Sequence, residues 1–259
     1  MVSLKITSVL ALAIAAFSVN ASEIDRRDGA AIDKRPTYDG VEATENCESF
    51  DEQFNANTDL NTHWEKFNNA STYTLSSSGL EMKILKPGSG SKLGMGSLFS
   101  SKKLVQYGRI EAKMKSAPVG GLVTAFIFMS PNGDEIDWEW VGPEVQTAYY
   151  YKGIPDFSTA DAKKLVDQSD VYHTYTIDWQ PDSITWYIDN KLHRTVKKSD
   201  TQKDGEYHFP QEASHVELGL WDASGSKTTA EWAHGPINWS AQPEYISAFV
   251  EYVKVTCHG

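Results

Sequence analysis

Short segments in which apolar and polar residues alternate recur along this 259-residue chain, mainly in its second half. Alternation with a period of two places the apolar side chains on one face of a β-strand, and turn-forming residues separate the segments. Helical periodicity is scarce. Strands that each bury one face pack as two antiparallel sheets, so the pattern predicts one all-β sandwich domain over residues 45–259. The alternating segments are 107–114, 123–129, 135–140, 172–179, 183–188, 215–221 and 248–255.

One of these segments, residues 134–140, carries acidic residues at alternate positions. On a strand, Glu135, Asp137 and Glu139 would all point to one side, and the apolar residues between them would point toward a core. Three like charges on one face raise the free energy of the folded state. Paired carboxylates are the catalytic groups of glycoside hydrolysis, so this strand is a candidate active site.

The spacing of the two glutamates suggests a reaction type. At ~3.3 Å per residue, the Cα atoms of Glu135 and Glu139 should lie roughly 13 Å apart. If each side chain leans inward, the carboxyl carbons come within about 5 to 6 Å, near the spacing of retaining glycosidases. Asp137 would lie between them and share a proton within the cluster. The alternative is a solvated edge strand whose acids prevent aggregation, and spacing alone favours neither interpretation.

The first residues resemble a secretory signal. Lys5 provides a positive charge, an apolar run too short to span a bilayer follows, and small residues precede position 22, so residues 1–21 are predicted to be a signal peptide. Residues 22–44 are polar and without periodicity, which predicts a flexible pro-segment or linker, with a plain disordered terminus as the alternative. No later apolar run is long enough to cross a bilayer, so we expect a secreted, extracellular protein with no transmembrane segment.

Two cysteines and two short motifs fit this compartment. Cys47 and Cys257 are the two cysteines of the chain, and cysteines of secreted proteins usually form a disulfide. Their bond would restrict the unfolded chain by roughly 4 to 5 kcal/mol in the chain-entropy model. Asn69-Ala70-Ser71 and Asn238-Trp239-Ser240 match the N-glycosylation pattern, which makes Asn69 and Asn238 candidate glycosylation sites.

Charge and histidine spacing argue against several partners. The net charge of −11 would repel the phosphates of nucleic acid and fits a neutral or cationic partner. The histidines show no metal-ligand spacing, so we expect no metal and no other cofactor. This holds for His173, His193, His208, His215 and His234, five of the seven histidines of the chain.

Several segments together resemble glycoside hydrolase family 16, whose fold is a concanavalin-like β-jelly roll. Residues 134–139 resemble its signature strand, and residues 107–115 resemble the strand that precedes the site. Residues 173–179 and 184–189 resemble a later hairpin, so the resemblance covers roughly residues 47–257.

Further residues resemble the fungal Crh-type branch of that family, which cross-links chitin to cell-wall glucan. The resemblance rests on Trp138, on Gln146-Thr147 with Tyr149, and on residues 231–233 with 238–239. Two positions depart from it. Ala148 stands where those proteins usually have Asn, and His234 stands where they usually have Gly.

This resemblance implies a role for each acid. Glu135 would be the nucleophile, Glu139 the general acid/base, and Asp137 the residue that assists the nucleophile. Attack by Glu135 would give a covalent glycosyl-enzyme, which either water or another sugar hydroxyl then releases, with no nucleotide sugar required.

Aromatic side chains are candidates for substrate binding, because sugar rings stack on flat apolar surfaces. Eight tryptophans are more than a core of this size needs, although for each of them a place in the core is the alternative. Tyr149 and Tyr150 alternate in direction, and the resemblance favours Tyr149 as the one that faces the cleft. The substrate-binding candidates are Tyr149, Lys152, Trp221, Glu231, Trp232 and Trp239.

The sequence therefore predicts a secreted, monomeric, retaining transglycosylase of the fungal cell wall. Its donor would be a β-1,4-linked, chitin-type chain, and its acceptor β-glucan or chitin. One alternative is plain hydrolysis by an endo-β-glucanase or chitinase. A second is a carbohydrate-binding sandwich without catalysis, since a fold alone does not establish activity.

Overall fold

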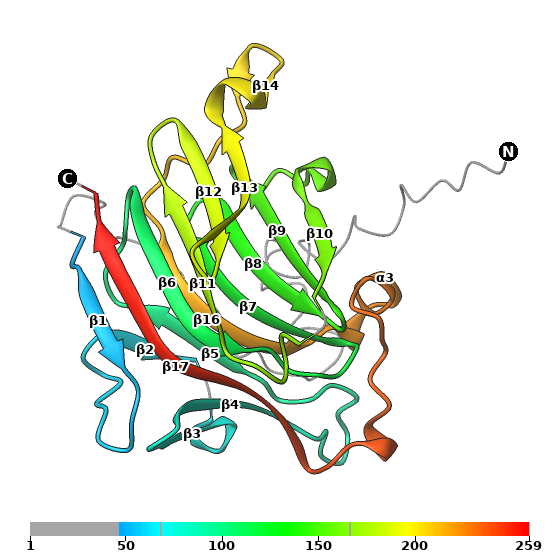
Figure 1. Ribbon diagram of the computed structural model, residues 1–259. Helices are drawn as coiled ribbons and strands as arrows, with labels where there is room; N and C mark the ends of the chain where they lie inside the picture. The colour runs from blue at the N-terminus through cyan, green and yellow to red at the C-terminus, as the bar shows by residue number, and fades with distance from the viewer. Residues whose placement is uncertain (1–46, 68, 166, 259) are drawn as a thin grey trace, which may run out of the picture.

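Two large antiparallel sheets, stacked face to face and both curved, make up most of the protein (Figure 1). The computed structural model describes residues 47–67, 69–165 and 167–258. The predicted signal peptide, residues 1–21, and the predicted pro-segment, residues 22–44, lie outside these ranges. The prediction of an all-β sandwich is confirmed.

The first sheet, here called the outer sheet, has the strand order β13-β12-β11-β6-β17-β4-β3, and β1 also pairs with β17. Its strands are β1 (Phe50–Gln53), β3 (Tyr73–Ser76), β4 (Gly79–Leu85), β6 (Gly108–Lys115), β11 (His173–Trp179), β12 (Ser183–Ile188), β13 (Lys191–Lys197) and β17 (Tyr245–Cys257).

The second sheet, here called the carboxylate sheet, has the order β10-β9-β8-β7-β16-β5-β2. Its strands are β2 (Trp64–Lys66), β5 (Ser97–Ser101), β7 (Leu122–Met129), β8 (Glu135–Val141), β9 (Glu144–Tyr150), β10 (Asp161–Lys164) and β16 (His215–Asp222). A separate hairpin pairs β14 (Gln202–Lys203) with β15 (Glu206–Tyr207).

Helical structure is short in the described residues. One α-helix, α3 (Lys227–Trp232), follows β16. The 3-10 helices are η2 (Ala70–Thr72), η3 (Phe157–Thr159), η4 (Lys198–Thr201), η5 (Ala223–Gly225) and η6 (Trp239–Ala241). No helix in the described ranges has the length and apolarity that crossing a bilayer requires.

The core lies between the two sheets, and the period-two pattern explains which residues enter it. Along β6, buried and half-buried residues alternate strictly, and Ile110, Ala112 and Met114 are fully buried. On β8 of the other sheet, Trp138 and Trp140 point into the same core. Each sheet therefore contributes one apolar face, and the opposite faces carry the polar side chains.

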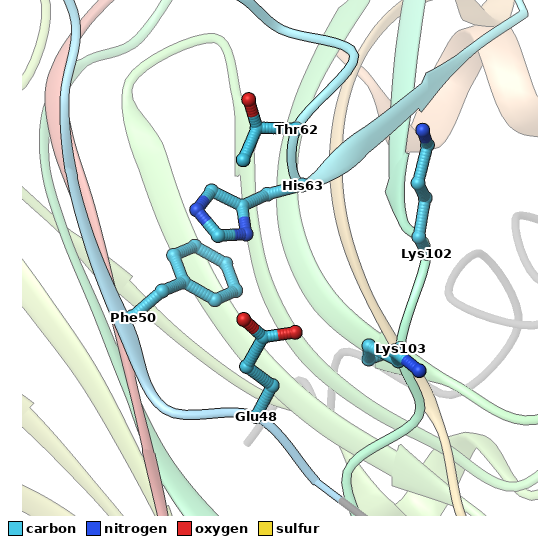
Figure 2. A pocket seen from close by; sticks show the side chains of 6 residues that line it. All are labelled: Glu48, Phe50, Thr62, His63, Lys102 and Lys103. Atoms are coloured by element: carbon cyan, nitrogen blue, oxygen red, sulfur yellow. The ribbon is translucent and has the colours of Figure 1, made fainter.

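A small pocket lies at the edge of the carboxylate sheet, beside β2 (Figure 2). The ring of His63 stacks on Phe50 with 4.2 Å between the ring centroids. Strands β5, β16 and β7 separate β2 from β8. This pocket therefore lies apart from the acidic strand. The six side chains that line it are Glu48, Phe50, Thr62, His63, Lys102 and Lys103.

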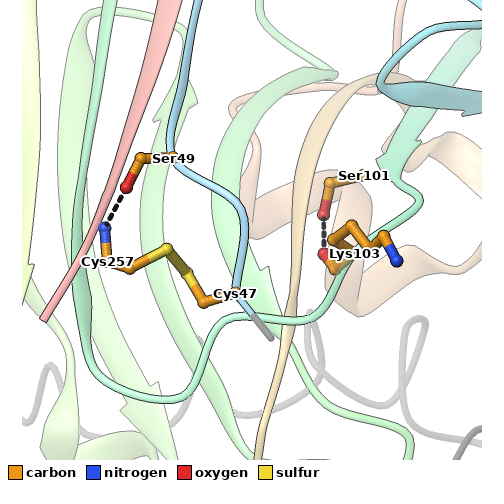
Figure 3. The surroundings of a disulfide bond; sticks show 5 residues. All are labelled: Cys47, Ser49, Ser101, Lys103 and Cys257. Atoms are coloured by element: carbon orange, nitrogen blue, oxygen red, sulfur yellow. Dashed lines mark hydrogen bonds between the residues drawn. A yellow bond between two sulfur atoms is a disulfide. The ribbon is translucent and has the colours of Figure 1, made fainter. Parts of the chain in front are cut away.

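A disulfide joins Cys47 to Cys257, as the sequence predicts, across 210 residues of chain (Figure 3). Cys257 ends β17, and its backbone N–H donates a hydrogen bond of 2.9 Å to the Ser49 hydroxyl. Pairing of β1 with β17 continues the connection into the outer sheet. The two ends of the folded domain are therefore fixed to each other.

Candidate active site

The three acids of β8 share the outward face of the carboxylate sheet and are all buried. Glu135 is 4% exposed, Asp137 1% and Glu139 7%. Strand β8 lies inside the sheet, because β7 pairs with it on one side and β9 on the other. The alternative of a solvated edge strand is therefore wrong: this strand is paired on both sides, and water does not screen its charges.

Burial changes the protonation of this cluster. Burial, and then the charge of Glu135, raise the pKa of Glu139 from 4.5 to about 8. At neutral pH Glu139 is thus mainly a neutral acid with a proton to donate. Burial also raises the pKa of Tyr150, and the charges of Asp137, Glu139 and Glu135 raise it further, so its phenol stays neutral.

The strand register identifies the residues beside each acid, because directly opposite residues share a face of the sheet. On β9, Tyr150 lies opposite Glu135 and Gln146 lies opposite Glu139. Both are buried and both were missed by the sequence analysis as site residues. Their signal was present in the sequence, since a short turn between two strands fixes which residues face each other. On β7 the opposite residues are the apolar Met129, Ile127 and Ala125.

The expectation that Tyr149, and not Tyr150, faces the acids is wrong. Tyr149 lies opposite Ile136, whose side chain enters the core, and it packs against that core. The guanidinium of Arg194, from the outer sheet, lies 6.0 Å from its ring centroid. Tyr150 takes the place on the acidic face, because neighbours on a strand point to opposite sides.

Trp221 and Trp232 lie together near the Glu139 end of the acidic face. Trp221 on β16 lies opposite Val123, which in turn lies opposite Val141, two residues beyond Glu139. Its ring stacks on Trp232 of α3 with 6.3 Å between centroids. The indole N–H of Trp232 donates a 3.1 Å hydrogen bond to the side-chain oxygen of Gln146. Two of the six candidates for substrate binding are therefore joined to the site through Gln146.

The structure does not bring Glu231 and Trp239 to the acids. Glu231 is exposed and forms a 3.7 Å ion pair with Lys227, one turn earlier on the same helix. The indole N–H of Trp239 donates a 3.1 Å bond to Asp222, and its ring packs against the main core. These contacts indicate a structural role for Trp239, whereas a role of Glu231 in substrate binding stays a prediction.

Lys152 lies in the turn after β9, near the Glu135 end of the strand. Its backbone N–H donates a 2.7 Å bond to the carboxylate of Asp134, the residue before Glu135. Its exposed side chain extends over the ring of Tyr151, with 4.5 Å from the ammonium to the centroid. The backbone of Lys152 is thus fixed beside the site while its charged end faces solvent.

Asp134 holds two segments at this end of β8. Besides the N–H of Lys152, its fully buried carboxylate accepts N–H bonds from Gln211, at 2.7 Å, and Glu212, at 3.0 Å. The segment before β16 and the turn after β9 are therefore held together where β8 begins. No period in the sequence indicates this anchor.

The two departures from the resemblance have local consequences. Ala148 lies opposite Asp137, so a methyl group stands where an amide would face that acid. His234 has a φ of +59°, a backbone conformation that glycine adopts without strain. Its ring nitrogen lies 3.4 Å from the Glu144 carboxylate, a contact that glycine could not make.

Other sequence-based candidates were also located. Asn69 and Asn238 are both exposed, and their glycosylation stays a prediction. In the ranges that the structure covers, no group of three His, Cys, Asp or Glu side chains is placed to hold a metal ion.

A curved β-sandwich with a row of buried carboxylates on one outward face fits a glycoside hydrolase. The chain belongs to one family of these enzymes, the glycosyl hydrolases family 16, whose model matches residues 54–241.

Two of the proteins that it is similar to come from fungi. The chain is 37% identical to Crh-like protein 2 of Aspergillus fumigatus over 181 residues, which cover 64% of this chain and 41% of that protein. It is 35% identical to Congo red hypersensitive protein 2 of Saccharomyces cerevisiae over 175 residues, or 63% of this chain and 38% of that protein. The matched region therefore spans about two fifths of the length of these relatives.

One solved structure is similar to this protein over most of both chains. The structure described as Crh5 transglycosylase in complex with NAG aligns with a TM-score of 0.71 at 29% identity. The alignment covers 82% of this chain and 85% of that chain. The β-jelly-roll fold expected from the sequence is confirmed.

Proposed function

We propose that this protein is a retaining transglycosylase of the fungal cell wall, with Glu135 as nucleophile and Glu139 as general acid/base. Its donor is a chitin-type chain and its acceptor is β-glucan or chitin. The observation that carries the proposal is the pair of buried glutamates on one face of β8, of which Glu139 holds its proton near neutral pH.

The chemistry follows from the two protonation states. Ionised Glu135 attacks the anomeric carbon, while Glu139 donates its proton to the departing glycosidic oxygen. The product is a covalent glycosyl-enzyme, and Glu139 is now a carboxylate. It then accepts the proton of an incoming hydroxyl, which attacks the same carbon and frees Glu135. Asp137, between the two, stabilises the arrangement by sharing a proton with the nucleophile.

The relatives support a sugar, rather than water, as the acceptor. The structural relative with a TM-score of 0.71 is described as a transglycosylase bound to NAG, which supports a chitin-type donor. Near Glu139, Trp221 and Trp232 stack on each other and are only 7% and 5% exposed, so they support this end of the site and offer an acceptor sugar little surface of their own. The resemblance to cell-wall enzymes and the disulfide support a secreted protein at the cell wall.

The proposal is tested by incubating the protein with chitin oligosaccharides and a fluorescent β-glucan acceptor. The expected result is fluorescence in products longer than the acceptor, absent in the Glu135→Gln variant. New reducing ends without labelled long products would show plain hydrolysis instead. Binding of chitin oligosaccharides with no turnover of any wall polysaccharide would identify a non-catalytic sandwich.

A further inference from the structure

A buried tryptophan of the outer sheet is hydrogen-bonded to the backbone of the acidic strand. The indole N–H of Trp186, on β12, donates a 2.9 Å bond to the backbone oxygen of Asp137. Trp186 is fully buried, and a buried indole N–H needs an acceptor. Strand carbonyls ordinarily bond to neighbouring strands of their own sheet, whereas this one also accepts a bond from across the core. The bond therefore connects the supporting sheet directly to the residue between the two glutamates.

A second bond runs between the sheets in the opposite direction. The indole N–H of Trp138, the next residue on β8, donates a 3.1 Å bond to the backbone oxygen of Thr176 on β11. Strands β11 and β12 are neighbours in the outer sheet. Two adjacent residues of β8 are thus bonded to the outer sheet: Trp138 donates to β11, and Asp137 accepts from β12.

Arg194 extends this connection to β9. It lies opposite Trp186 in the register of β12 and β13, and its guanidinium carbon lies 5.1 Å from the Trp186 ring centroid. One guanidinium nitrogen donates to the backbone oxygen of Thr147, at 2.9 Å, and the other donates to that of Thr159, at 2.6 Å. Thr147 lies opposite Trp138, so β8 and β9 are both held at the level of Asp137.

Packing of apolar side chains alone is non-directional. These hydrogen bonds, in contrast, fix both the distance of β8 from the outer sheet and its position along the strand axis. Catalytic groups need this kind of support, because a displacement of about 1 Å can reduce a rate 10²-fold. We propose that Trp186 is a positioning residue, which acts through the Asp137 carbonyl to set where the three carboxylates of β8 stand. This inference rests on the proposed function of those carboxylates.

Trp186→Phe removes the donor and keeps a buried aromatic ring. Trp179→Phe is the matched control. Trp179 is also fully buried in the outer sheet, and its indole N–H donates to the backbone oxygen of Pro210, at 3.3 Å, in the segment that Asp134 holds at the start of β8, and not to a residue between the two glutamates. Each variant loses one indole–carbonyl bond, so the two should lose similar free energy of unfolding.

Three measurements separate positioning from stability: the free energy of unfolding in urea, kcat and KM on chitin oligosaccharides, and the titration of ¹³C-carboxyl-labelled glutamate. The last needs no turnover. The signal to follow is that of Glu139, whose pKa burial raises to about 8. The other titratable groups on the same face of the sheet are Glu65, Glu135, Asp137, Glu144, Tyr150, Lys164, His215 and Glu217.

We expect Trp186→Phe to lower kcat about 10-fold with KM nearly unchanged, and to shift the Glu139 titration. Trp179→Phe should change both less, because its bond reaches only the segment beside Asp134. Equal kinetics and equal titrations in the two variants would overturn the inference. If the wild-type protein shows no turnover, the proposed function fails, and the titration still decides the positioning role.

Should Trp186→Phe fail to fold, Trp138→Phe removes the reciprocal bond and provides the second variant. Its Glu139 titration should also shift relative to that of Trp179→Phe. An unshifted titration in this variant would overturn the inference as well.

Discussion

The outward faces of the two sheets differ in how their charged side chains are arranged. On the outer sheet, acidic and basic side chains alternate and pair at the surface. Lys113 and Glu251 lie 2.6 Å apart, and each is about one third exposed. On the carboxylate sheet, three acids follow one another along β8, all buried, and the residues opposite them on β7 and β9 include no lysine or arginine.

This difference separates charges that water screens from charges that the fold buries. Exposed ion pairs contribute little to stability, and water screens them. Buried acids of like sign lower stability and raise each other's pKa, so a fold keeps them where a proton must be held near neutral pH. Residues that dominate activity should therefore lie on one sheet, while the other mainly supports the fold.

Glu135→Gln should have the largest effect on activity. Without a nucleophile, turnover of chitin oligosaccharides should fall at least about 10³-fold. The free energy of unfolding should stay the same or rise, because one buried charge is removed. Initial rates and urea unfolding on the same preparation check both. A variant that loses stability in proportion to its activity would contradict the division between the sheets.

Removing the disulfide should have the opposite effect: a loss of stability with activity retained. In Cys47→Ser with Cys257→Ser, the unfolded chain gains freedom over 210 residues, which lowers stability by about 5 kcal/mol in the chain-entropy model. Below the unfolding transition, kcat should remain near wild type, because neither cysteine lies on the acidic face. Guanidinium unfolding and rates at 25 °C test this, and a large loss of kcat in folded protein would refute it.

The pH dependence of the free energy of unfolding should reflect the titration of Glu139. Its pKa is about 8 in the folded protein against 4.5 as the reference, so folding takes up a proton between these values. The contribution of the protonated acid is complete below about pH 4.5 and is lost as the pH rises through about 8. Activity should fall over the same alkaline limb, since the general acid loses its proton.

Glu139→Gln is the control for this dependence. It should flatten the change in unfolding free energy between pH 5 and pH 8.5, measured in urea at each pH. If the wild-type curve is already flat there, the acid is not held protonated.

Glu251→Gln should have the smallest effect. It breaks the exposed pair with Lys113 and should lower the free energy of unfolding by less than about 1 kcal/mol. Activity should be unchanged. A strong loss of turnover from this substitution would show that the outer face takes part in catalysis.

Local pattern was enough to predict the sandwich and the acidic face of β8, because a period of two is a property of neighbouring residues. It also showed that Tyr149 and Tyr150 point in opposite directions. Which of them faces the acids depends on the register across the β8–β9 turn, and the choice of Tyr149 was wrong for that reason.

Contacts between distant residues could not be predicted in this way. Trp186 and Asp137 are 49 positions apart, and the bond between them depends on how two sheets stack. The raised pKa of Glu139 likewise comes mainly from burial, which only the assembled fold provides. Trp239 carried the same aromatic signal as Trp221, yet one packs on the core and the other lies on the acidic face.

Because Asp134 binds only main-chain groups, the side chains of the three residues that it anchors can be replaced. Its carboxylate accepts bonds from the main-chain N–H groups of Lys152, Gln211 and Glu212, and so places no demand on their side chains. Substitutions at these three positions can alter what this end of the acidic face binds while the backbone, and Glu135 beside it, stay where they are. A chain built in this way can change the side chains at this end of the acidic face by point mutation without rebuilding β8.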